Sequence, residues 1–271
     1  MGVAGSPRLT WPPKLNLPLV ADRVSGFIRR RVEEAGTNGV VIGLSGGLDS
    51  STTAYLCVRA LGPSRVLCLI MPDENVTPKE DVEDAKLVAN TLGVEYHLIP
   101  ITKAFDALTE ALDQLYKPEE YRSAGNIRAR IRMILLYYAA NALNRLVAGT
   151  SDKSEVMIGY FTKYGDGAAD LLPMGNLYKT QVKELARFLG VPKHIVAKPS
   201  SPRLWRGQTA EQELGLSYEV IDPVLYASYE LGMSSEDVAK ELNVPLEVVE
   251  RVKLMVERSA HKRSLPPMAE L

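Results

Sequence analysis

The stretch Val40-Val41-Ile42-Gly43-Leu44-Ser45-Gly46-Gly47-Leu48-Asp49-Ser50-Ser51 decides the fold. Its first residues are apolar and β-branched, as is typical of a buried parallel strand, and they run directly into a glycine turn. Gly46 and Gly47 can adopt backbone angles that other residues avoid, and Ser50 or Ser51 is expected to cap a following helix. We therefore expect a strand, a tight turn and a helix here.

This turn also predicts an anion site, and phosphate is the anion that suits it best. Successive N–H groups in such a turn point the same way, and a helix adds about half a positive charge at its N-terminus. Asp49 places a carboxylate beside the site, which suggests a Mg²⁺ ion between carboxylate and phosphates. The pattern is not the Walker loop, because no Lys-Ser or Lys-Thr pair closes it. The alternative is a strand, turn and helix that use two glycines for structural reasons alone.

The composition excludes several classes of protein. Of the 271 residues 24% are charged and 46% hydrophobic, and the formal net charge of −1 gives no basic field that would favour nucleic acid. No apolar run approaches the roughly 20 residues that a membrane span needs. Cys57 and Cys68 are too few for a disulfide framework and lie in apolar stretches, so we expect buried free thiols and a cytoplasmic location. Residues 1–13 lack a signal-peptide core and are expected to be flexible.

Apolar periodicity predicts helices and strands that alternate along the first half of the chain. Helices are expected at residues 19–35, 51–61, 78–92, 102–115, 126–146 and 179–189. Strands are expected from residue 40 and at residues 66–70, 95–99 and 147–150. This alternation predicts an α/β fold, a doubly wound parallel sheet with helices on both faces, followed by a helical part at residues 217–259. We expect a lead-in at residues 1–18, one domain at 19–262 and a tail at 263–271.

Three segments carry less specific signals. Residues 198–216 are polar, broken by prolines and include Trp205. This composition indicates an exposed, mobile loop of the kind that covers a site. Residues 234–258 have the outline of a DNA-binding helix-turn-helix, but Glu247 and Glu250 would repel phosphates, so packing helices are the better interpretation.

Three alternating arginines stand near the start of the expected helix 126–146: Arg128, Arg130 and Arg132. Positive charge at a helix N-terminus opposes the helix dipole. Either an anionic ligand or partner chain compensates these arginines, or they form a surface salt-bridge cluster.

The motifs together resemble a known family. The string Ser45–Ser50 is similar to the SGGxDS pyrophosphate loop of the ATP-pyrophosphatase superfamily. From about residue 19 to residue 262, the order and spacing of further motifs resemble ammonia-dependent NAD synthetases. The most specific motif is Tyr-Phe-Thr-Lys-Tyr-Gly-Asp-Gly at residues 160–167; the others are residues 125–130, residues 149–155, Lys179 and the pair His261-Lys262. The resemblance implies a Rossmann-like fold of the adenine nucleotide α-hydrolase type.

The resemblance also implies a reaction and a set of site residues. The reaction is ATP-dependent amidation of deamido-NAD to NAD through an adenylated carboxylate, with release of AMP and pyrophosphate and with free or partner-delivered ammonia as nitrogen donor. ATP is the implied co-substrate and Mg²⁺ the implied metal, held by Asp49 and Glu155. The residues implied for ATP are Gly43, Leu44, Ser45, Gly46, Gly47, Leu48, Asp49, Ser50, Thr150, Lys179 and Ser201. Those implied for deamido-NAD are Arg130, Lys163, Asp170, His261 and Lys262, and those implied for catalysis are Asp49, Lys179 and Asp170.

Family members are homodimers, so the resemblance implies a second copy of this chain as a partner, with neither nucleic acid nor membrane. Asp166 and Asp170 both remain candidates for the group that accepts the proton of ammonium.

Three other functions stay open. Another amidotransferase of the superfamily would lack the block at residues 159–173 and would usually carry a glutaminase domain. A tRNA-thiolating enzyme would need a basic surface and reactive cysteines. A non-catalytic adenine-nucleotide-binding module would keep the loop but would not need Glu155, Lys163, Asp170 and Lys179, so their joint presence favours the enzyme.

Overall fold

A parallel sheet organises the computed structural model, which describes residues 12–112, 114–115, 117 and 119–269. Within these residues the strands are β1 (Val40–Gly43), β2 (Val66–Ile70), β3 (Glu95–Leu98) and β4 (Leu146–Val147), in the order β3-β2-β1-β4. All three pairings are parallel, and Val40 of β1 lies opposite both Val66 and Leu146. The expected strand at 147–150 is shorter than predicted, because beyond Val147 only an isolated bridge from Ala148 to Leu171 continues the pairing.

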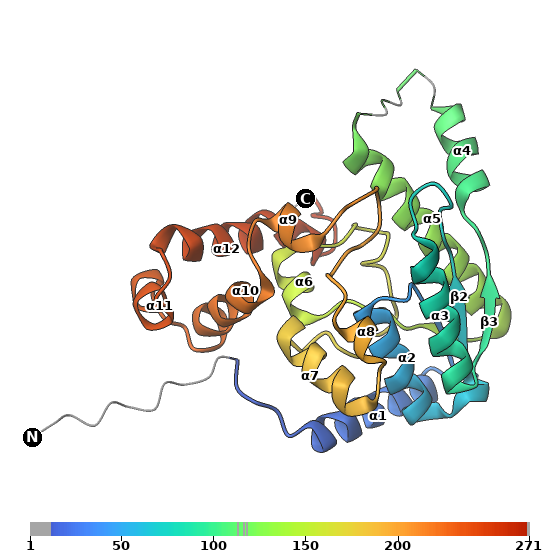
Figure 1. Cartoon of the computed structure of the whole chain (residues 1–271), viewed down its shortest axis with the longest axis horizontal. Helices are drawn as coiled ribbons and strands as arrows, with labels where there is room; N and C mark the ends of the chain where they lie inside the picture. The colour runs from blue at the N-terminus through green and yellow to red at the C-terminus, as the bar shows by residue number, and fades with distance from the viewer. Residues whose placement is uncertain (1–11, 113, 116, 118, 270–271) are drawn as a thin grey trace, which may run out of the picture.

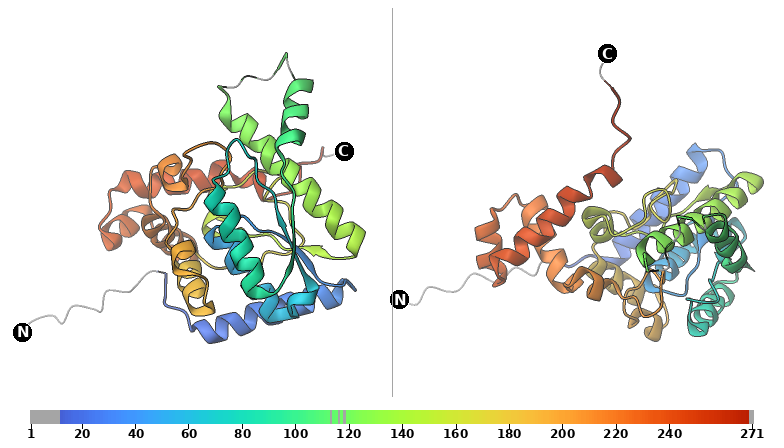
Figure 2. Two further views of the ribbon diagram at one scale, coloured as in Figure 1. Left: turned by 45° about the vertical axis from the view of Figure 1, so that its right-hand side comes forward. Right: turned by 90° about the horizontal axis from the view of Figure 1, so that it is seen from above.

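Helices cover both faces of the sheet, which confirms the doubly wound architecture. One face packs against α1 (Leu17–Glu34), α2 (Leu48–Leu61), α3 (Lys79–Leu92) and α7 (Lys179–Leu189). The other face packs against α4 (Thr102–Ala111) and α5 (Tyr121–Leu143). The left view of Figure 2 shows α3 in teal and α5 in green on opposite sides of the strands.

Local sequence explains the position of α1. Asn16 is its N-cap and accepts a hydrogen bond from the Leu19 amide, and a proline stands in the first turn, where its missing N–H costs nothing. Residues 1–11 of the predicted lead-in lie outside the described residues. Gln181 of α7 donates a hydrogen bond to the Pro13 carbonyl, so residues just before α1 already contact the domain.

Three helices begin earlier than the sequence predicts, and one of them is α1, which starts at Leu17 rather than at residue 19. The helix α5 starts at Tyr121 rather than at residue 126, so the three arginines lie beyond its first turn. Because the helix dipole acts within the first turn, the predicted opposition between these arginines and the dipole is wrong. The helix α2 starts at Leu48 rather than at residue 51, and α4 ends at Ala111 rather than at residue 115.

The C-terminal part forms a second, helical core beside the sheet (Figure 1). It contains α6 (Lys153–Ile158), α9 (Ala210–Leu214), α10 (Tyr218–Leu225), the π-helical η2 (Tyr226–Glu230), α11 (Ser235–Leu242) and α12 (Leu246–Arg258). Short segments complete the chain: η1 (Pro63–Arg65), α8 (Lys193–Val196) and η3 (Ala260–Lys262).

The pair α11 and α12 packs into this core rather than standing apart. Val238, Val249 and Val252 are fully buried there, while Glu247 and Glu250 are exposed. This supports the interpretation of residues 234–258 as packing helices. No helix among the described residues combines the length and the apolar character that a membrane crossing requires.

Candidate active site

The loop between β1 and α2 is held by its own side chains. Ser50 Oγ accepts a hydrogen bond from the Ser45 amide at 3.1 Å, lies 2.9 Å from Ser45 Oγ, and donates to the Gly47 carbonyl. The N-cap of α2 is Gly47, with no side-chain cap, so the prediction that Ser50 or Ser51 caps the helix is wrong. Ser50 instead closes the loop, and the first-turn N–H groups of α2 stay free for an anion.

Gly46 is required by both conformation and space. Its φ is +76°, and a Cβ atom at this position would lie 2.1 Å from the carbonyl oxygen of Asp81 on α3. The loop therefore packs directly against α3, and only glycine permits the approach.

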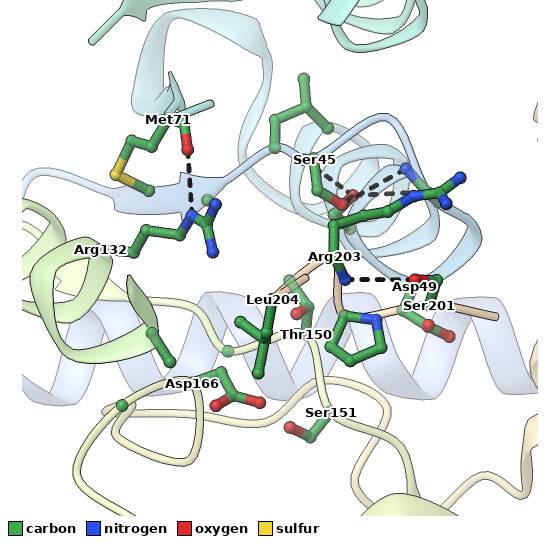
Figure 3. A pocket seen from close by; sticks show the side chains of 18 of the residues that line it. Ser45, Asp49, Met71, Arg132, Thr150, Ser151, Asp166, Ser201, Arg203 and Leu204 are labelled. Atoms are coloured by element: carbon green, nitrogen blue, oxygen red, sulfur yellow. Dashed lines mark hydrogen bonds between the residues drawn. The ribbon is translucent and has the colours of Figure 1, made fainter. Parts of the chain in front are cut away.

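A pocket of about 240 Å³ opens at the carboxyl ends of β1, β2 and β4, where parallel sheets place their ligands (Figure 3). Its walls come from the β1–α2 loop, from α5, from residues 147–155 and 165–168, and from residues 198–204. Most predicted ATP residues line it: Gly43, Leu44, Ser45, Gly47, Leu48, Asp49, Ser50, Thr150 and Ser201. Gly46 is not among the lining residues, because it packs against the backbone of Asp81.

Lys179 lies beneath this pocket and binds three carboxylates. Its side chain is fully buried, and Nζ is 2.8 Å from Asp49 Oδ2, from Asp152 Oδ2 and from Glu155 Oε1. Burial alone would lower the pKa of Lys179, but the three acids together raise it well above its usual value. Burial also raises the pKa of Asp152 to about 6 and that of Glu155 well above its ordinary value, and Lys179 partly offsets both.

The cluster is positioned by a further buried acid, Asp222, which the sequence analysis did not single out. Asp222 of α10 accepts hydrogen bonds from Ser154 Oγ at 2.5 Å and from the Thr180 amide at 2.8 Å. Ser154 Oγ in turn accepts a hydrogen bond from the Lys179 amide at 2.9 Å. These contacts fix α6 and the first turn of α7 against each other, so Lys179 and Glu155 meet at one point. Asp152 was also missed, although its spacing to Glu155 is that of a capping box, which the structure contains.

Residues 198–209 lie over the pocket and are tied to the sheet domain. Lys198 and Arg203 both bind Asp81 of α3, with Nζ–Oδ1 2.7 Å and Nε–Oδ2 2.8 Å, and Lys198 also donates to the Gly46 carbonyl. The Ser201 hydroxyl, predicted to meet a phosphate, donates to the Gln208 carbonyl instead. The segment is largely half-buried and runs into α9, so the predicted exposure is wrong; its mobility stays a prediction.

Comparison with known proteins decides the family. The family model described as NAD synthase matches residues 20–266. The chain is 56% identical to the NH(3)-dependent NAD(+) synthetase of Hyperthermus butylicus over 248 residues, which are 92% of this chain and 89% of the relative. The chain belongs to the NAD synthase family. It is also 51% identical to the protein of the same description from Methanocaldococcus jannaschii, over 93% of this chain and 96% of the relative.

Solved structures of NAD synthase relatives show the same fold. The NMN synthetase from Francisella tularensis superposes with a TM-score of 0.84 at 35% identity, covering 95% of this chain and all of that one. The NH3-dependent NAD synthetase from Campylobacter jejuni, solved with a nitrate ion, superposes with a TM-score of 0.79 at 32% identity, covering 94% and 100%.

The predicted deamido-NAD residues of this NAD synthase fall into two groups. Arg130 Nη2 donates to the Lys163 carbonyl, Lys163 Nζ donates to the His261 carbonyl, and Lys262 Nζ donates to the carbonyls of Gly159 and Phe161. Arg130, Lys163, His261 and Lys262 therefore gather outside the pocket lining. Asp170 forms the second group by itself. Its carboxylate lies between α5 and β4, where it accepts hydrogen bonds from the Tyr137 hydroxyl and the Val147 amide.

Proposed function

We propose that this chain makes NAD from deamido-NAD, ATP and ammonia. The observation that carries the proposal is the glycine loop of β1–α2 lining the pocket, with Asp49 at its end bound to the Lys179 carboxylate cluster, in a chain that belongs to the NAD synthase family. The ring carboxylate of deamido-NAD is an anion with no leaving group, so ammonia cannot displace its oxygen directly. Activation by ATP answers that difficulty.

The reaction has two steps that the pocket suits. A carboxylate oxygen attacks the α-phosphorus of ATP, and the bond to pyrophosphate breaks; ammonia then attacks the acyl carbon, loses a proton, and AMP leaves. The N–H groups at the start of α2, the hydroxyls of Ser45 and Ser50, Thr150 and Lys179 bind the phosphates. Ser201 joins them once its bond to Gln208 is exchanged for one to a phosphate. The protein works by positioning and charge stabilisation.

The residues present fit Mg²⁺. Asp49 Oδ1 is buried without a hydrogen-bond partner, and the other Asp49 oxygen and Glu155 Oε1 approach the same cation, Lys179 Nζ. Among the described residues no set of three or more acids, histidines or cysteines is arranged as a metal site by itself. Asp49 and Glu155 would hold Mg²⁺ together with substrate phosphates, which is how proteins usually bind this ion. When bound, the ion neutralises phosphate charge and leaves the loop and Lys179 to orient the triphosphate.

Asp166 is the better proton acceptor of the two candidates. It lines the pocket, whereas Asp170 is held by Tyr137 and Val147. Desolvation raises the pKa of Asp166, although the Thr162 amide, which donates to its Oδ1 at 2.8 Å, partly offsets this; the rise brings this carboxylate closer to the range that suits a general base. We assign deamido-NAD to the surface of Arg130, Lys163, His261 and Lys262; Asp170 is not part of this surface.

A second copy of the chain covers the exposed face of α5 in this proposal. Ile134 and Tyr138, one turn apart on the same side of the helix, are 58% and 74% exposed there. Apolar side chains gathered on one helix face favour burial in a dimer. Sedimentation should show a dimer for the wild type and a monomer for Tyr138→Glu. A cytoplasmic location is also proposed, and the two buried free cysteines support it.

One assay tests the proposal. Purified protein is incubated with ATP, Mg²⁺, ammonium and either deamido-NAD or the corresponding nicotinic acid mononucleotide, and the amide product, AMP and pyrophosphate are quantified. We expect NAD, AMP and pyrophosphate in equal amounts, dependent on ammonium. If only the mononucleotide gave products, the mononucleotide and not deamido-NAD would be the substrate. ATP cleavage without amide formation would refute the proposed function.

A further inference from the structure

Arg132 is the one member of the α5 series Arg128, Arg130 and Arg132 that lines the pocket, and it forms no ion pair with an acid of the described residues. Arg128 Nε is 2.6 Å from Asp73 Oδ2, and its guanidinium stacks 3.8 Å above the Phe105 ring. Arg130 is exposed to solvent. Arg132 donates from Nε to the Met71 carbonyl at 3.0 Å, and no carboxylate of the described residues forms an ion pair with it.

The Arg132 guanidinium faces the pocket. Arg132 lines it together with Ala129 and Met133 of the same helix, and Figure 3 shows its side chain extending from α5 toward Met71 with the terminal nitrogens beyond this contact. The Nε–Met71 bond fixes the plane of the group at the carboxyl end of β2. Two amino groups are thereby presented to the cavity in the fork geometry that suits phosphate and carboxylate oxygens.

The energetic cost of this arrangement points to an anionic ligand. Burial lowers the pKa of Arg132 to about 10; the nearby carboxylates of Asp73 and Asp166 partly offset this, and Arg128 adds to it, so the group is charged at neutral pH but poorly solvated. A desolvated charge without a direct ion-pair partner is unfavourable, and it is compensated when an oxyanion binds beside it.

The position of Arg132 indicates which anion of the proposed reaction it binds. The β- and γ-phosphates belong to the loop and to Lys179, which is where pyrophosphate departs. Arg132 stands on the α5 wall at the end of β2, beside the apolar lining formed by Leu69, Leu136 and Val147, a surface suited to a nucleoside. We propose that Arg132 binds the α-phosphate of ATP and then the phosphate of the acyl adenylate. The inference rests on the proposed function and adds a residue to it.

In this role Arg132 transfers no proton. The attacking carboxylate oxygen forms a bond to the α-phosphorus, and the electron pair of the breaking bond leaves with pyrophosphate. The guanidinium donates two hydrogen bonds to the oxygens of the phosphate that stays behind, so the adenylate is retained while pyrophosphate leaves the loop.

The test compares AMP with adenosine, which lacks the charge, by titration calorimetry on Arg132→Gln and Arg132→Lys. The matched control is Arg122→Gln, on the same helix, whose side chain is 68% exposed. A charged hydrogen bond to phosphate predicts that Arg132→Gln weakens AMP binding on the order of 10- to 100-fold and adenosine binding less than about 3-fold. Arg132→Lys should keep part of the difference, and Arg122→Gln should change neither affinity.

Each outcome has a distinct meaning. Equal weakening of AMP and adenosine would make Arg132 a residue that only shapes the pocket, and this would overturn the inference. An unchanged AMP affinity with a raised KM for deamido-NAD would overturn it in favour of the ring carboxylate. If the wild type binds AMP but makes no NAD, the proposed function fails, while the comparison of AMP with adenosine still decides the role of Arg132. Should Arg132→Gln fail to fold, Arg132→Lys carries the same comparison.

Discussion

Replacing Lys179 with methionine removes the only positive charge that contacts the three carboxylates of the cluster among the described residues. Methionine fills a similar volume but leaves Asp49, Asp152 and Glu155 facing one another, each having lost a partner at 2.8 Å. Breaking a buried ion pair by removing one partner costs about 3–5 kcal/mol. Because a chain of this size loses about 2 °C of Tm per kcal/mol, we expect Tm to fall by roughly 6–10 °C at neutral pH.

The pH dependence of this loss has a definite sign. The pKa values of Asp152 and Glu155 are already raised in the folded protein, mainly by burial, and Lys179 holds them down. Without Lys179 both pKa values rise further, so both acids take up protons in the folded state at a higher pH than in the unfolded chain. A group with a raised folded-state pKa favours folding as the pH falls toward its unfolded value. The deficit of Lys179→Met should therefore be largest near pH 8 and shrink toward pH 5.

Thermal unfolding between pH 5 and pH 8, in buffer with a chelator, measures both effects. Lys183→Met is the matched control on the same helix, because Lys183 forms an exposed pair with Glu219 at 3.0 Å that should contribute at most about 1 kcal/mol. Equal Tm losses for the two variants at pH 8, or a Lys179→Met deficit that stays constant with pH, would refute the reasoning.

Three further predictions concern the loop, the metal and the α5 arginines. Gly46→Ala should destabilise the protein by about 2–4 kcal/mol and abolish ATP binding, whereas Gly26→Ala, with open space in α1, should stabilise it by about 0.5–1 kcal/mol; denaturant unfolding compares them. Asp49→Asn and Glu155→Gln should each raise the Mg²⁺ concentration for half-maximal rate on the order of 10-fold or more, and an active double variant would contradict their role. Arg128→Ala should cost about 3–5 kcal/mol by leaving Asp73 buried and unpaired, and addition of Asp73→Asn should recover part of that loss in urea titrations.

Much of the sheet could be predicted because its signals are local. The β2 strand is found at the predicted residues, and α7 begins and ends where periodicity places it. Helix starts were less predictable, because the decisive contacts are tertiary. Gly47 starts α2 without a side-chain cap, and Ser50 closes the loop instead, so a serine at the expected cap position served another purpose.

The pocket residues also divide into those that a local motif predicts and those that only tertiary contacts reveal. Asp49 and Glu155 stand in motifs, and their approach to one cation follows once two neighbouring strands end at the same edge of the sheet. Asp81 and Asp222 stand in no motif that was recognised. Their importance comes from contacts across 42 to 122 positions of sequence, such as Thr180 to Asp222 and Arg203 to Asp81, which no periodicity encodes.

The C-terminal helices help to position Glu155 and Lys179, because α6 joins the two cores. One end of α6 presents Glu155 to the pocket, and its other end packs against the end of α12, where a Cβ atom on Gly159 would lie 2.1 Å from that of Ser259. Asp222 of α10 fixes the start of α6 through Ser154, and the Lys179 amide donates a hydrogen bond to that serine. A displacement of α10 or α12 must therefore move Glu155 and Lys179 relative to the loop on β1. The helix pair that resembles a DNA-binding motif in sequence thus packs, through the end of α12, against the segment that carries Glu155.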